Sequence, residues 1–449
     1  MKKKFVLVGT GGRSSMYLEA IAADFKDIAE LCAICDTNQT RMDYYNRILN
    51  EKYGMVPVPT YKAADFDKMI ADVHPDKVIV TSMDRTHHQY ICRAMELGCD
   101  VITEKPMTID AAKCQQIIDT KKRTGRDIVV TFNYRYSPRN TKVKELLQSG
   151  LVGEVTTVHF EWLLDTIHGA DYFRRWHRYK LNNGGLLVHK STHHFDLMNW
   201  WLNSAPDTVY AMADLKFYGK INAEKRGINQ FYYRCRGSEI AAKDPFGINI
   251  SAEKNDVLNE LYYKAEHEDC YYRDLSVFSD GITTEDNMSV MVRYKNNTVM
   301  TYNLCAHTPW EGYRVCFNGT KGRLEFNVVE RAVCDPKEGA DMTTFGNGEL
   351  EKTPGLGDGI DRKALVPEII FQPLWGAPRV INYEATTLAG HGGGDIRLLT
   401  DVFRGAQPDP LNHAAGYIDG VNSIMTGIAA NRSIETGLPM RISDLIHLD

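Results

Sequence analysis

The sequence predicts an α/β protein with two units: a parallel sheet covered by helices, followed by a strand-rich unit with a largely antiparallel sheet. Three observations predict this arrangement. Short apolar runs alternate with amphipathic patterns over residues 5–132, which is typical of parallel strands joined by helices. Runs of alternating apolar residues, separated by short turn sequences, dominate the second half. The chain has 449 residues, and roughly 100–200 residues per domain favours more than one domain.

Composition excludes several functional classes. Apolar residues make up 43% and charged residues 25% of the chain, and the formal net charge is −5. Basic residues form no dense block beyond residues 2–4, so we expect no nucleic-acid partner. No apolar run reaches the roughly 18 residues of a transmembrane helix, so we expect no membrane partner. The 10 cysteines lack a compact disulfide spacing, which predicts free thiols and a cytoplasmic location.

The chain begins with the pattern of a dinucleotide-binding unit. A buried strand is expected at residues 5–8, and a second strand at residues 31–35 ends at Asp36. Between them lie a glycine-rich turn at residues 9–14 and a helical pattern. Gly9 permits a tight turn, Gly11 lets the backbone approach a pyrophosphate, and the helix N-terminus offers free N–H groups to the phosphates. Ser14 stands where the fingerprint has its third glycine.

Asp36 predicts which dinucleotide is preferred. A carboxylate at the tip of the second strand can accept hydrogen bonds from the ribose hydroxyls and would repel a 2′-phosphate. The sequence therefore favours NAD over NADP. Arg13 and Arg41 leave NADP as the less favoured alternative, because an arginine near the ribose can accommodate the extra phosphate.

The alternation of strands and helices continues to residue 132. Further helices are expected at residues 64–73, 86–97 and 108–124, and further strands at residues 77–81, 100–103 and 127–132. Ligands of such sheets bind at the carboxyl ends of the strands, where the strand order reverses. The loops expected to form the site are residues 9–14, 81–88, 104–108 and 133–139.

Several motifs resemble those of a known family. Glu104-Lys105-Pro106 follows an expected strand, residues 184–196 read G-G-L-L-V-H-K-S-T-H-H-F-D, and residues 319–322 and 427–433 read G-T-K-G and G-I-A-A-N-R-S. Through these motifs the chain resembles the glucose–fructose oxidoreductase, inositol dehydrogenase and MocA (Gfo/Idh/MocA) family. The resemblance implies a doubly wound Rossmann domain at residues 1–132 and an α+β domain with a large, open, mostly antiparallel sheet at residues 133–449. It also implies oxidation or reduction of sugar and polyol carbons with NAD(P).

The resemblance assigns catalytic roles to Lys105 and His193. It implies that Lys105 reaches both the nicotinamide and the substrate hydroxyl, and that His193 acts as the acid or base. A histidine near its ordinary pKa of about 6.5 can accept a hydroxyl proton while a lysine stabilises the developing alkoxide. Where dehydrogenases of the family usually carry aspartate, this chain has His189, four residues before His193. That spacing predicts one shared helical face, so His189 is a third candidate catalytic residue.

Two other interpretations of the histidine pair stay open. The pair could be structural, on a buried helix, or it could supply two ligands to a zinc ion, since an i, i+4 spacing suits that geometry. Lys190 directly follows His189, and a cation at this place argues against a metal. The sequence therefore predicts no metal site.

The remaining candidate site residues come from the same loops and motifs. The residues expected to bind the dinucleotide are Gly9, Thr10, Gly11, Gly12, Arg13, Ser14, Asp36, Thr81, Ser82, His87, Glu104, Lys105 and Asn133. The residues expected to bind the substrate are Arg135, Arg175, Trp176, His177, His189, His193 and His391.

For two of the residues expected to bind the substrate, an interpretation without a role in binding stays open. Trp176 and its neighbours belong to a polar and aromatic cluster at residues 168–177, which can line a sugar pocket because aromatic faces stack on sugar rings. The alternative is a solvated surface turn. His391 opens the sequence H-G-G-G-D and either closes the pocket or is an ordinary loop histidine.

The second unit is expected to be an antiparallel meander. Its strands are predicted at residues 155–162, 208–217, 287–294, 298–306, 313–318 and 322–328. An insert at about residues 218–285 interrupts the sheet, residues 330–390 look loop-like, and residues 412–430 look helical. A sheet face of this size is normally covered, so we expect a homo-oligomer, a dimer or tetramer, through the C-terminal sheet.

Together with these patterns, the resemblance implies an NAD-dependent dehydrogenase that acts on a secondary alcohol of a sugar, glycoside or cyclitol. The C3 hydroxyl of a glycoside is favoured, because the insert suggests a substrate larger than a free monosaccharide. Two alternatives remain: a glycosidase that retains NAD and works by transient oxidation and elimination, and a non-catalytic regulator that binds NAD.

Overall fold

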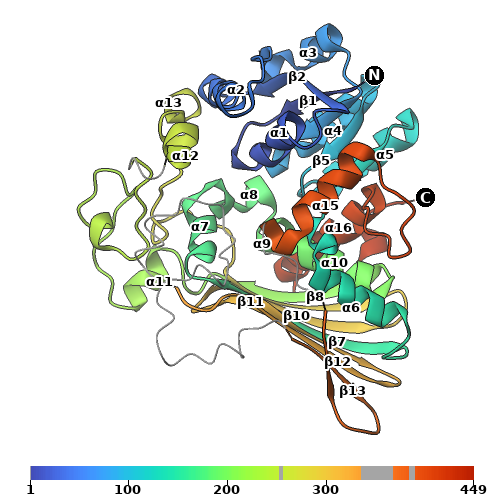
Figure 1. Cartoon of the computed structure of the whole chain (residues 1–449). Coiled ribbons are helices and arrows are strands. Elements are labelled where there is room, and N and C mark those ends of the chain that lie inside the picture. The colour runs from blue at the N-terminus through green and yellow to red at the C-terminus, as the bar shows by residue number, and fades with distance from the viewer. Residues whose placement is uncertain (1, 252–255, 335–367, 384–389, 449) are drawn as a thin grey trace.

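Two sheets organise the chain. The computed structural model describes residues 2–251, 256–334, 368–383 and 390–448, with the side chains of residues 256 and 390–393 left out of that description. A six-stranded sheet lies in the N-terminal third and a nine-stranded sheet in the rest. In Figure 1 the smaller sheet lies above the larger one, and helices of the C-terminal part lie between them.

The N-terminal sheet is parallel throughout and has the order β3-β2-β1-β4-β5-β6. Its strands are β1 (Lys3–Val8), β2 (Ala29–Asp36), β3 (Thr60–Lys62), β4 (Lys77–Val80), β5 (Asp100–Thr103) and β6 (Ile128–Val130). Its helices are α1 (Ser15–Ala22), α2 (Gln39–Tyr53), α3 (Phe66–Val73), α4 (His87–Glu96) and α5 (Ala111–Thr124). Because β1 has β2 on one side and β4 on the other, the strand order reverses at β1, which confirms the doubly wound prediction.

Two elements of this sheet were absent from the sequence prediction. The strand β3 has only three residues, none of them buried, and the helix α2 is mostly polar. Strand β3 is too short to show a period, and the buried Met42, Tyr45 and Leu49 of α2 give only a narrow apolar stripe in a mostly polar helix, so the signal that sequence patterns detect is weak. Helix α2 is instead marked by its ends, since the side chain of Asn38 accepts the N–H of Arg41 and Gly54 ends the helix in a left-handed conformation.

The large sheet has the order β14-β13-β12-β11-β7-β10-β9-β8-β15. Its strands are β7 (Val155–Asp165), β8 (Pro206–Asp214), β9 (Asn287–Tyr294), β10 (Val299–Thr308), β11 (Glu311–Gly319), β12 (Gly322–Arg331), β13 (Glu368–Pro373), β14 (Arg379–Ile381) and β15 (Met440–Arg441). The predicted simple meander is wrong at one place, because β7 lies between β10 and β11 and is parallel to β10. The sheet is otherwise antiparallel, as predicted.

The predicted loop at residues 330–390 is also wrong in part. Strands β13 and β14 lie within it and extend the sheet beyond β12, with Leu324 opposite Phe371. The alternating burial of β13 was hidden among neighbouring Gly and Pro residues. Residues 335–367 and 384–389 of this stretch lie outside the described part of the chain.

One face of the large sheet is covered by helices (Figure 1). The helices of this part of the chain are α6 (Pro138–Gln148), α7 (His168–Arg174), α8 (Lys180–Asn183), α9 (Leu186–His189), α10 (Thr192–Leu202), α15 (Gly390–Arg404) and α16 (Tyr417–Thr436). The core lies at this face, where Trp162 of β7 stacks between Tyr313 and His194 with ring centroids 4.5 and 3.8 Å away. Gly427 of α16 allows a close approach, since a Cβ atom there would lie 2.2 Å from the carbonyl oxygen of Leu187.

The predicted insert leaves the large sheet and reaches the N-terminal one. It contains α11 (Lys220–Lys225), α12 (Asp256–Leu258), a π-helical turn (Asn259–Tyr263) and α13 (Glu266–Asp269). Figure 1 shows α12 and α13 beside α2. Leu261 and Ala265 are buried there, so the insert is packed against the N-terminal unit.

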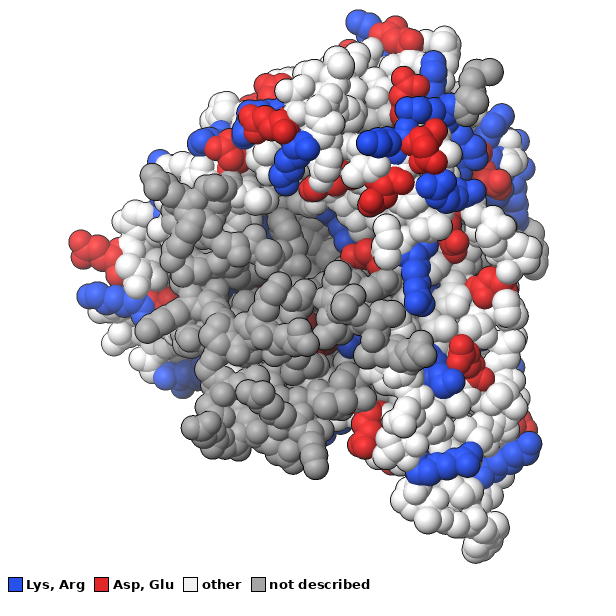
Figure 2. All heavy atoms as spheres, viewed as in Figure 1, with Lys and Arg blue, Asp and Glu red and all other residues white. Residues whose placement is uncertain are grey.

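The described surface carries charges of both signs. On the face in Figure 2, Lys and Arg side chains alternate with Asp and Glu over the N-terminal unit. None of the described helices combines the length and the apolar character needed to cross a membrane.

Candidate active site

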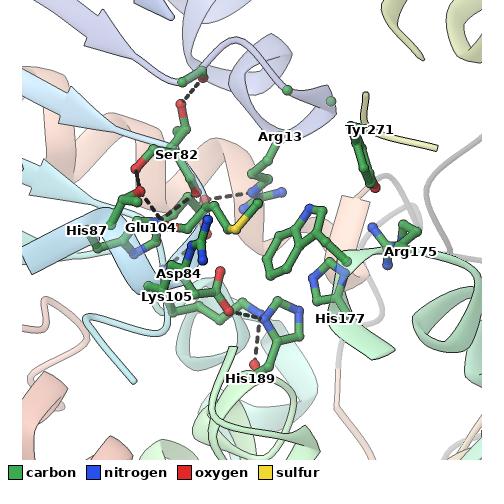
Figure 3. A pocket seen from close by; sticks show the side chains of 18 of the residues that line it. Arg13, Ser82, Asp84, His87, Glu104, Lys105, Arg175, His177, His189 and Tyr271 are labelled. Atoms are coloured by element: carbon green, nitrogen blue, oxygen red, sulfur yellow. Dashed lines mark hydrogen bonds and ion pairs between the residues drawn. The ribbon is translucent and has the colours of Figure 1, made fainter. Parts of the chain in front are cut away.

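A cavity of about 650 Å³ lies where the carboxyl ends of β1, β2, β4 and β5 face α7, α9 and α10. The structure brings together in its lining most of the residues that the sequence predicts for the site. These are Gly9, Gly11, Gly12, Arg13, Asp36, Thr81, Ser82, His87, Glu104, Lys105, Arg175, Trp176, His177, His189 and His193. Residues from both units thus share one cavity (Figure 3).

The glycine-rich turn follows β1. Gly9 has a φ of 95°, and a Cβ atom there would lie 2.4 Å from the backbone N of Ser82, so only glycine fits between these loops. A Cβ at Gly11 would meet no described atom nearer than the hydroxyl of Tyr262, at 3.9 Å. The turn is therefore open on the side that faces the cavity.

Thr10 and Ser14 hold the turn but do not line the cavity. The backbone N–H and the hydroxyl of Thr10 donate to Asp36 Oδ2 at 2.5 and 2.9 Å. The hydroxyl of Ser14 donates to the carbonyl oxygen of Gly11 at 2.6 Å. Both side chains are buried, so they connect the turn to the ends of β2 and α1 and act on a ligand only through the shape of the turn.

Glu104 and His87 fix the loop that carries Lys105. Glu104 Oε1 accepts hydrogen bonds from Arg13 Nε at 2.6 Å and from the Tyr17 hydroxyl at 2.7 Å. Burial opposes ionisation of Glu104, but Arg13 and these hydrogen bonds outweigh it and lower the pKa of the carboxyl. The ring of His87 bridges the carbonyl oxygens of Pro106 and Ser82 at 2.8 and 2.9 Å.

Lys105 lies in a buried group of opposite and like charges. Its Nζ donates to the carbonyl oxygen of His189 at 3.1 Å. Burial lowers the pKa of Lys105 to about 8, against the raising effect of Asp84 and Glu104. The ammonium is therefore close to its deprotonation at physiological pH, which is the range in which a group can exchange protons with a reactant.

Asp84 is a site residue that the sequence analysis did not single out. Its Oδ2 and Nδ1 of His189 are hydrogen-bonded at 2.5 Å, across the boundary between the two units (Figure 3). Burial raises the pKa of Asp84, while burial and the charge of Lys105 lower the pKa of His189 well below its ordinary value. Asp84 lies in the 81–88 loop that the sequence does place at the site, so its position was predictable although its partner was not.

The sequence spacing predicts that His189 and His193 share one helix, but the structure places them in two helices. The N–H of Ser191 bonds to the carbonyl oxygen of Leu186, five residues back, which closes α9 at His189. Helix α10 starts anew at Thr192 and carries His193, whose ring makes an edge contact with Tyr134 at 4.7 Å. Both histidines nevertheless line the same cavity.

Aromatic and basic side chains form the wall opposite Lys105. The ring of His177 stacks on Trp176 with centroids 3.6 Å apart and lies 4.2 Å from the ring of His189. Arg175 Nε lies 3.0 Å from Asp171 Oδ2, which orients the guanidinium. Burial and the charge of Arg175 lower the pKa of His177 well below its ordinary value, so this wall presents a neutral imidazole.

Arg135 and Asn133 lie away from the cavity. Arg135 donates to both carboxylate oxygens of Asp196, at 2.8 and 2.6 Å, inside the protein. Asn133 Nδ2 donates to Asp395 Oδ1 at 2.7 Å. Neither Arg135 nor Asn133 lines the cavity. His391 falls within α15, but its side chain is outside the described residues.

The insert supplies cavity residues that no local pattern indicated. Tyr262, Asp269 and Tyr271 line the cavity beside the glycine turn and Asp36 (Figure 3 shows Tyr271). The N–H of Gly12 donates to the hydroxyl of Tyr262 at 2.9 Å. Within the described residues, no three His, Cys, Asp or Glu side chains come together as ligands for a metal ion.

Comparisons with known proteins identify the family. Residues 3–132 match "Oxidoreductase family, NAD-binding Rossmann fold", and residues 144–442 match "Oxidoreductase family, C-terminal alpha/beta domain", which are the two Gfo/Idh/MocA domains. A Bacillus subtilis protein named "Putative oxidoreductase YteT" is 32% identical over 457 residues, which covers 99% of either chain. D-glucoside 3-dehydrogenase of Escherichia coli is 30% identical over 126 residues, or 28% of this chain and 34% of its own length.

A solved structure shares the fold. The WlbA dehydrogenase from Bordetella pertussis, in complex with NADH and UDP-GlcNAcA, matches with a TM-score of 0.60 and 16% identity, over 98% of this chain and 99% of that chain. This likeness concerns the fold alone. With both family domains matched in order along the chain, the protein belongs to the Gfo/Idh/MocA family of oxidoreductases.

Proposed function

We propose that this protein is an NAD-dependent dehydrogenase that oxidises a secondary alcohol of a carbohydrate, with the C3 hydroxyl of a glycoside favoured. One observation carries the proposal: Lys105 from the nucleotide-binding unit and His193 from the other unit open into the same cavity. Hydroxyl oxidation needs a cation beside the reacting oxygen and a group that takes its proton. The two residues would supply these functions.

The cavity suits a dinucleotide. The absence of a Cβ at Gly11 leaves room beside the turn, and Asp36 ends the next strand within the same cavity. The turn at Gly11 would face the diphosphate, Asp36 would hold the adenosine ribose, and Thr81 and Ser82 would lie on the nicotinamide side. When bound, the nicotinamide ring would accept a hydride from the substrate carbon. NAD, rather than NADP, is proposed because of the carboxylate at residue 36.

The side chains of this chain handle the proton. His193 takes the hydroxyl proton, and the Lys105 ammonium stabilises the negative charge that develops on the oxygen. The carbonyl oxygen of His189 holds Lys105 Nζ at 3.1 Å, and Asp84 fixes the His189 ring through its 2.5 Å hydrogen bond. Asp84 and His189 therefore position the lysine, and the neutral imidazole of His189 can also accept a substrate hydroxyl group.

The opposite wall favours a sugar ring. Trp176 offers an aromatic face, and the Arg175 guanidinium offers donors for hydroxyl groups. The partial likeness to D-glucoside 3-dehydrogenase supports the choice of a glycoside and of its C3 hydroxyl. The size of the cavity, about 650 Å³, lies within the range of roughly 300–1,000 Å³ that is typical of small-molecule sites.

An absorbance assay tests the proposal. The purified protein with NAD is presented with a panel of glycosides, free sugars and cyclitols, and NADH formation is followed at its absorption band. We expect NADH to form with at least one glycoside, and NMR of the product to show a ketone at C3. Release of free sugar without NADH would favour an NAD-retaining glycosidase, and NAD binding without any conversion would favour a non-catalytic regulator.

We also propose that copies of the chain associate through the open face of the large sheet, and that the protein works in the cytoplasm. Met212 of β8 and Met291 of β9 are 64% and 52% exposed on this face, and exposed apolar side chains of a sheet favour a covering partner. The free thiols support a reducing compartment. Light scattering should give a dimer or tetramer mass, and a monomer mass would contradict the association. Cell fractionation checks the location.

A further inference from the structure

Two cations flank the carboxylate that is proposed to hold the adenosine ribose. Lys62 of β3 pairs in register with Asp36 of β2, and Arg41 Nη1 lies 4.0 Å from Asp36 Oδ1. An arginine beside this position accommodates the 2′-phosphate of NADP in sheets of this type, and a lysine can also bind a phosphate as a point charge. By itself, the nucleotide-binding unit therefore carries the basic groups of an NADP site.

Two consecutive carboxylates of the insert hold both cations. Glu268 Oε2 accepts a hydrogen bond from Lys62 Nζ at 3.0 Å, and Asp269 Oδ2 lies 2.8 Å from Arg41 Nη2. Asp269 also lines the cavity, next to Asp36. The charges that would attract a 2′-phosphate are thus already paired by groups of the chain itself.

Glu268 occupies a set of donors that suits a phosphate. It accepts the backbone N–H groups of Gln39 and Thr40 and the Thr40 hydroxyl, each at 2.7 Å. These N–H groups have no partner within α2 itself, because they lie at its start, where the helix dipole favours an anion. Burial raises the pKa of Glu268, but the hydrogen bonds outweigh this effect and lower the pKa to about 2. The carboxylate is therefore ionised at neutral pH.

The segment that carries the two carboxylates is fixed in place. Asn38 Nδ2 donates to the carbonyl oxygen of Ala265 at 2.8 Å, and Arg41 Nε donates to that of Leu261 at 3.0 Å. The side chain of Leu261 is buried in the same core as β1 and α1. With the Tyr262 hydroxyl hydrogen-bonded to the glycine turn, the segment contacts both that turn and the start of α2.

We infer that Glu268 and Asp269 set the preference for NAD over NADP, as internal anions that take the place of the 2′-phosphate on Lys62, Arg41 and the start of α2. The inference rests on the proposed function, since it requires a dinucleotide in this cavity. A 2′-phosphate would meet Asp36, Glu268 and Asp269 and find its cations engaged. Like charges brought together in this way discriminate strongly between two ligands that are otherwise the same.

Titration with NADH and NADPH tests the inference without a substrate. The binding of each nucleotide to the full chain is followed by quenching of tryptophan fluorescence, for the wild type and for E268Q/D269N. We expect the wild type to bind NADH at least about tenfold more tightly than NADPH, and the double variant to shift this ratio by about tenfold or more toward NADPH. Adding R41A to the double variant should remove the gain, because the freed guanidinium is what receives the phosphate.

A matched control keeps the comparison specific. Glu260 lies in the same segment, but its carboxylate pairs with Lys264 and Arg47, so E260Q should leave the ratio unchanged. A folded double variant whose ratio moves less than about twofold would overturn the inference, as would a wild type that binds both nucleotides equally. If the double variant does not fold, E268Q alone must show part of the shift. A wild type that binds neither nucleotide would instead remove the proposed function itself.

Discussion

Replacement of Lys105 by alanine will lower kcat/KM for alcohol oxidation by about 10²- to 10⁴-fold, the range typical of a positioned acid–base group. The Kd for NADH should change little, because the glycine turn and Asp36 are the groups proposed to bind the other end of the nucleotide. The cause of the loss is the missing ammonium beside the substrate oxygen, which leaves the developing negative charge without a partner. Steady-state kinetics with the glycoside from the absorbance assay, together with fluorescence titration of NADH, measure the two quantities.

Lys113 provides a matched control for this substitution. It is also a lysine of the nucleotide-binding unit, but its Nζ pairs with Asp110 at 2.8 Å on the surface of α5. Lys113→Ala should therefore leave kcat/KM unchanged. If Lys105→Ala kept full activity while NADH still bound, the proposed role of Lys105 would be refuted.

The dependence of kcat/KM on pH distinguishes an effect of the Lys105 charge from an effect of the size of its side chain. Burial lowers the pKa of Lys105 to about 8, so the side chain carries its proton below that pH and loses it above. Because the charged form is the one proposed to stabilise the developing alkoxide, kcat/KM should fall as the pH rises through about 8. Lys105→Arg keeps a positive charge at every practical pH, so its residual activity should lack this decline. A decline that persists unchanged in the arginine variant would assign it to another group.

The parts of the site that were predictable from the sequence are those built from neighbouring residues. The turn after β1, Asp36 at the end of β2 and Lys105 after β5 each follow a short apolar strand, and a strand with its following loop is a local pattern. The parallel sheet then brings these loops to one edge. The same reasoning predicts a place at the site for the 81–88 loop, and residues 81–87 line the cavity.

The remaining parts depend on contacts between distant segments. The hydrogen bond between Asp84 and His189 crosses the two units, and the place of Asp269 beside Arg41 depends on how the insert packs. Neither contact leaves a periodic signal in its own segment. The end of α9 at His189 could not be predicted from the sequence either, since an i, i+4 spacing suggests one continuous helix. The backbone hydrogen bonds around Ser191 instead separate two helices.

The structure also predicts that Asp171 is essential for stability. Arg273 Nη1 and Nη2 donate to its two carboxylate oxygens at 2.6 and 2.9 Å, and Arg175 Nε lies 3.0 Å from Oδ2. Asp171 and Arg273 are 3% and 1% exposed. Asp171→Asn would keep the size of the side chain but leave the buried Arg273 guanidinium without its counter-charge. Removal of one partner from such a buried group typically costs about 3–5 kcal/mol of the free energy of unfolding.

Chemical denaturation followed by circular dichroism measures this loss, with Asp67→Asn as the control. Asp67 pairs with Arg93 at 2.6 Å on the surface, where an ion pair contributes about 0–1 kcal/mol. The pH dependence supplies a second test. Burial raises the pKa of Asp171, but the charges of Arg175 and Arg273 outweigh it and lower the pKa below its ordinary value.

Because the folded pKa of Asp171 is depressed, its contribution to stability is complete above the unfolded pKa of about 3.9 and is lost as the pH falls below that value. The wild type should therefore lose stability more steeply below about pH 4 than Asp171→Asn does. Since Arg273 belongs to the insert and Asp171 to α7, the variant should also expose the insert to limited proteolysis first. An Asp171→Asn protein as stable as Asp67→Asn, with the same acid slope as the wild type, would show that this buried group does not hold the insert over the cavity.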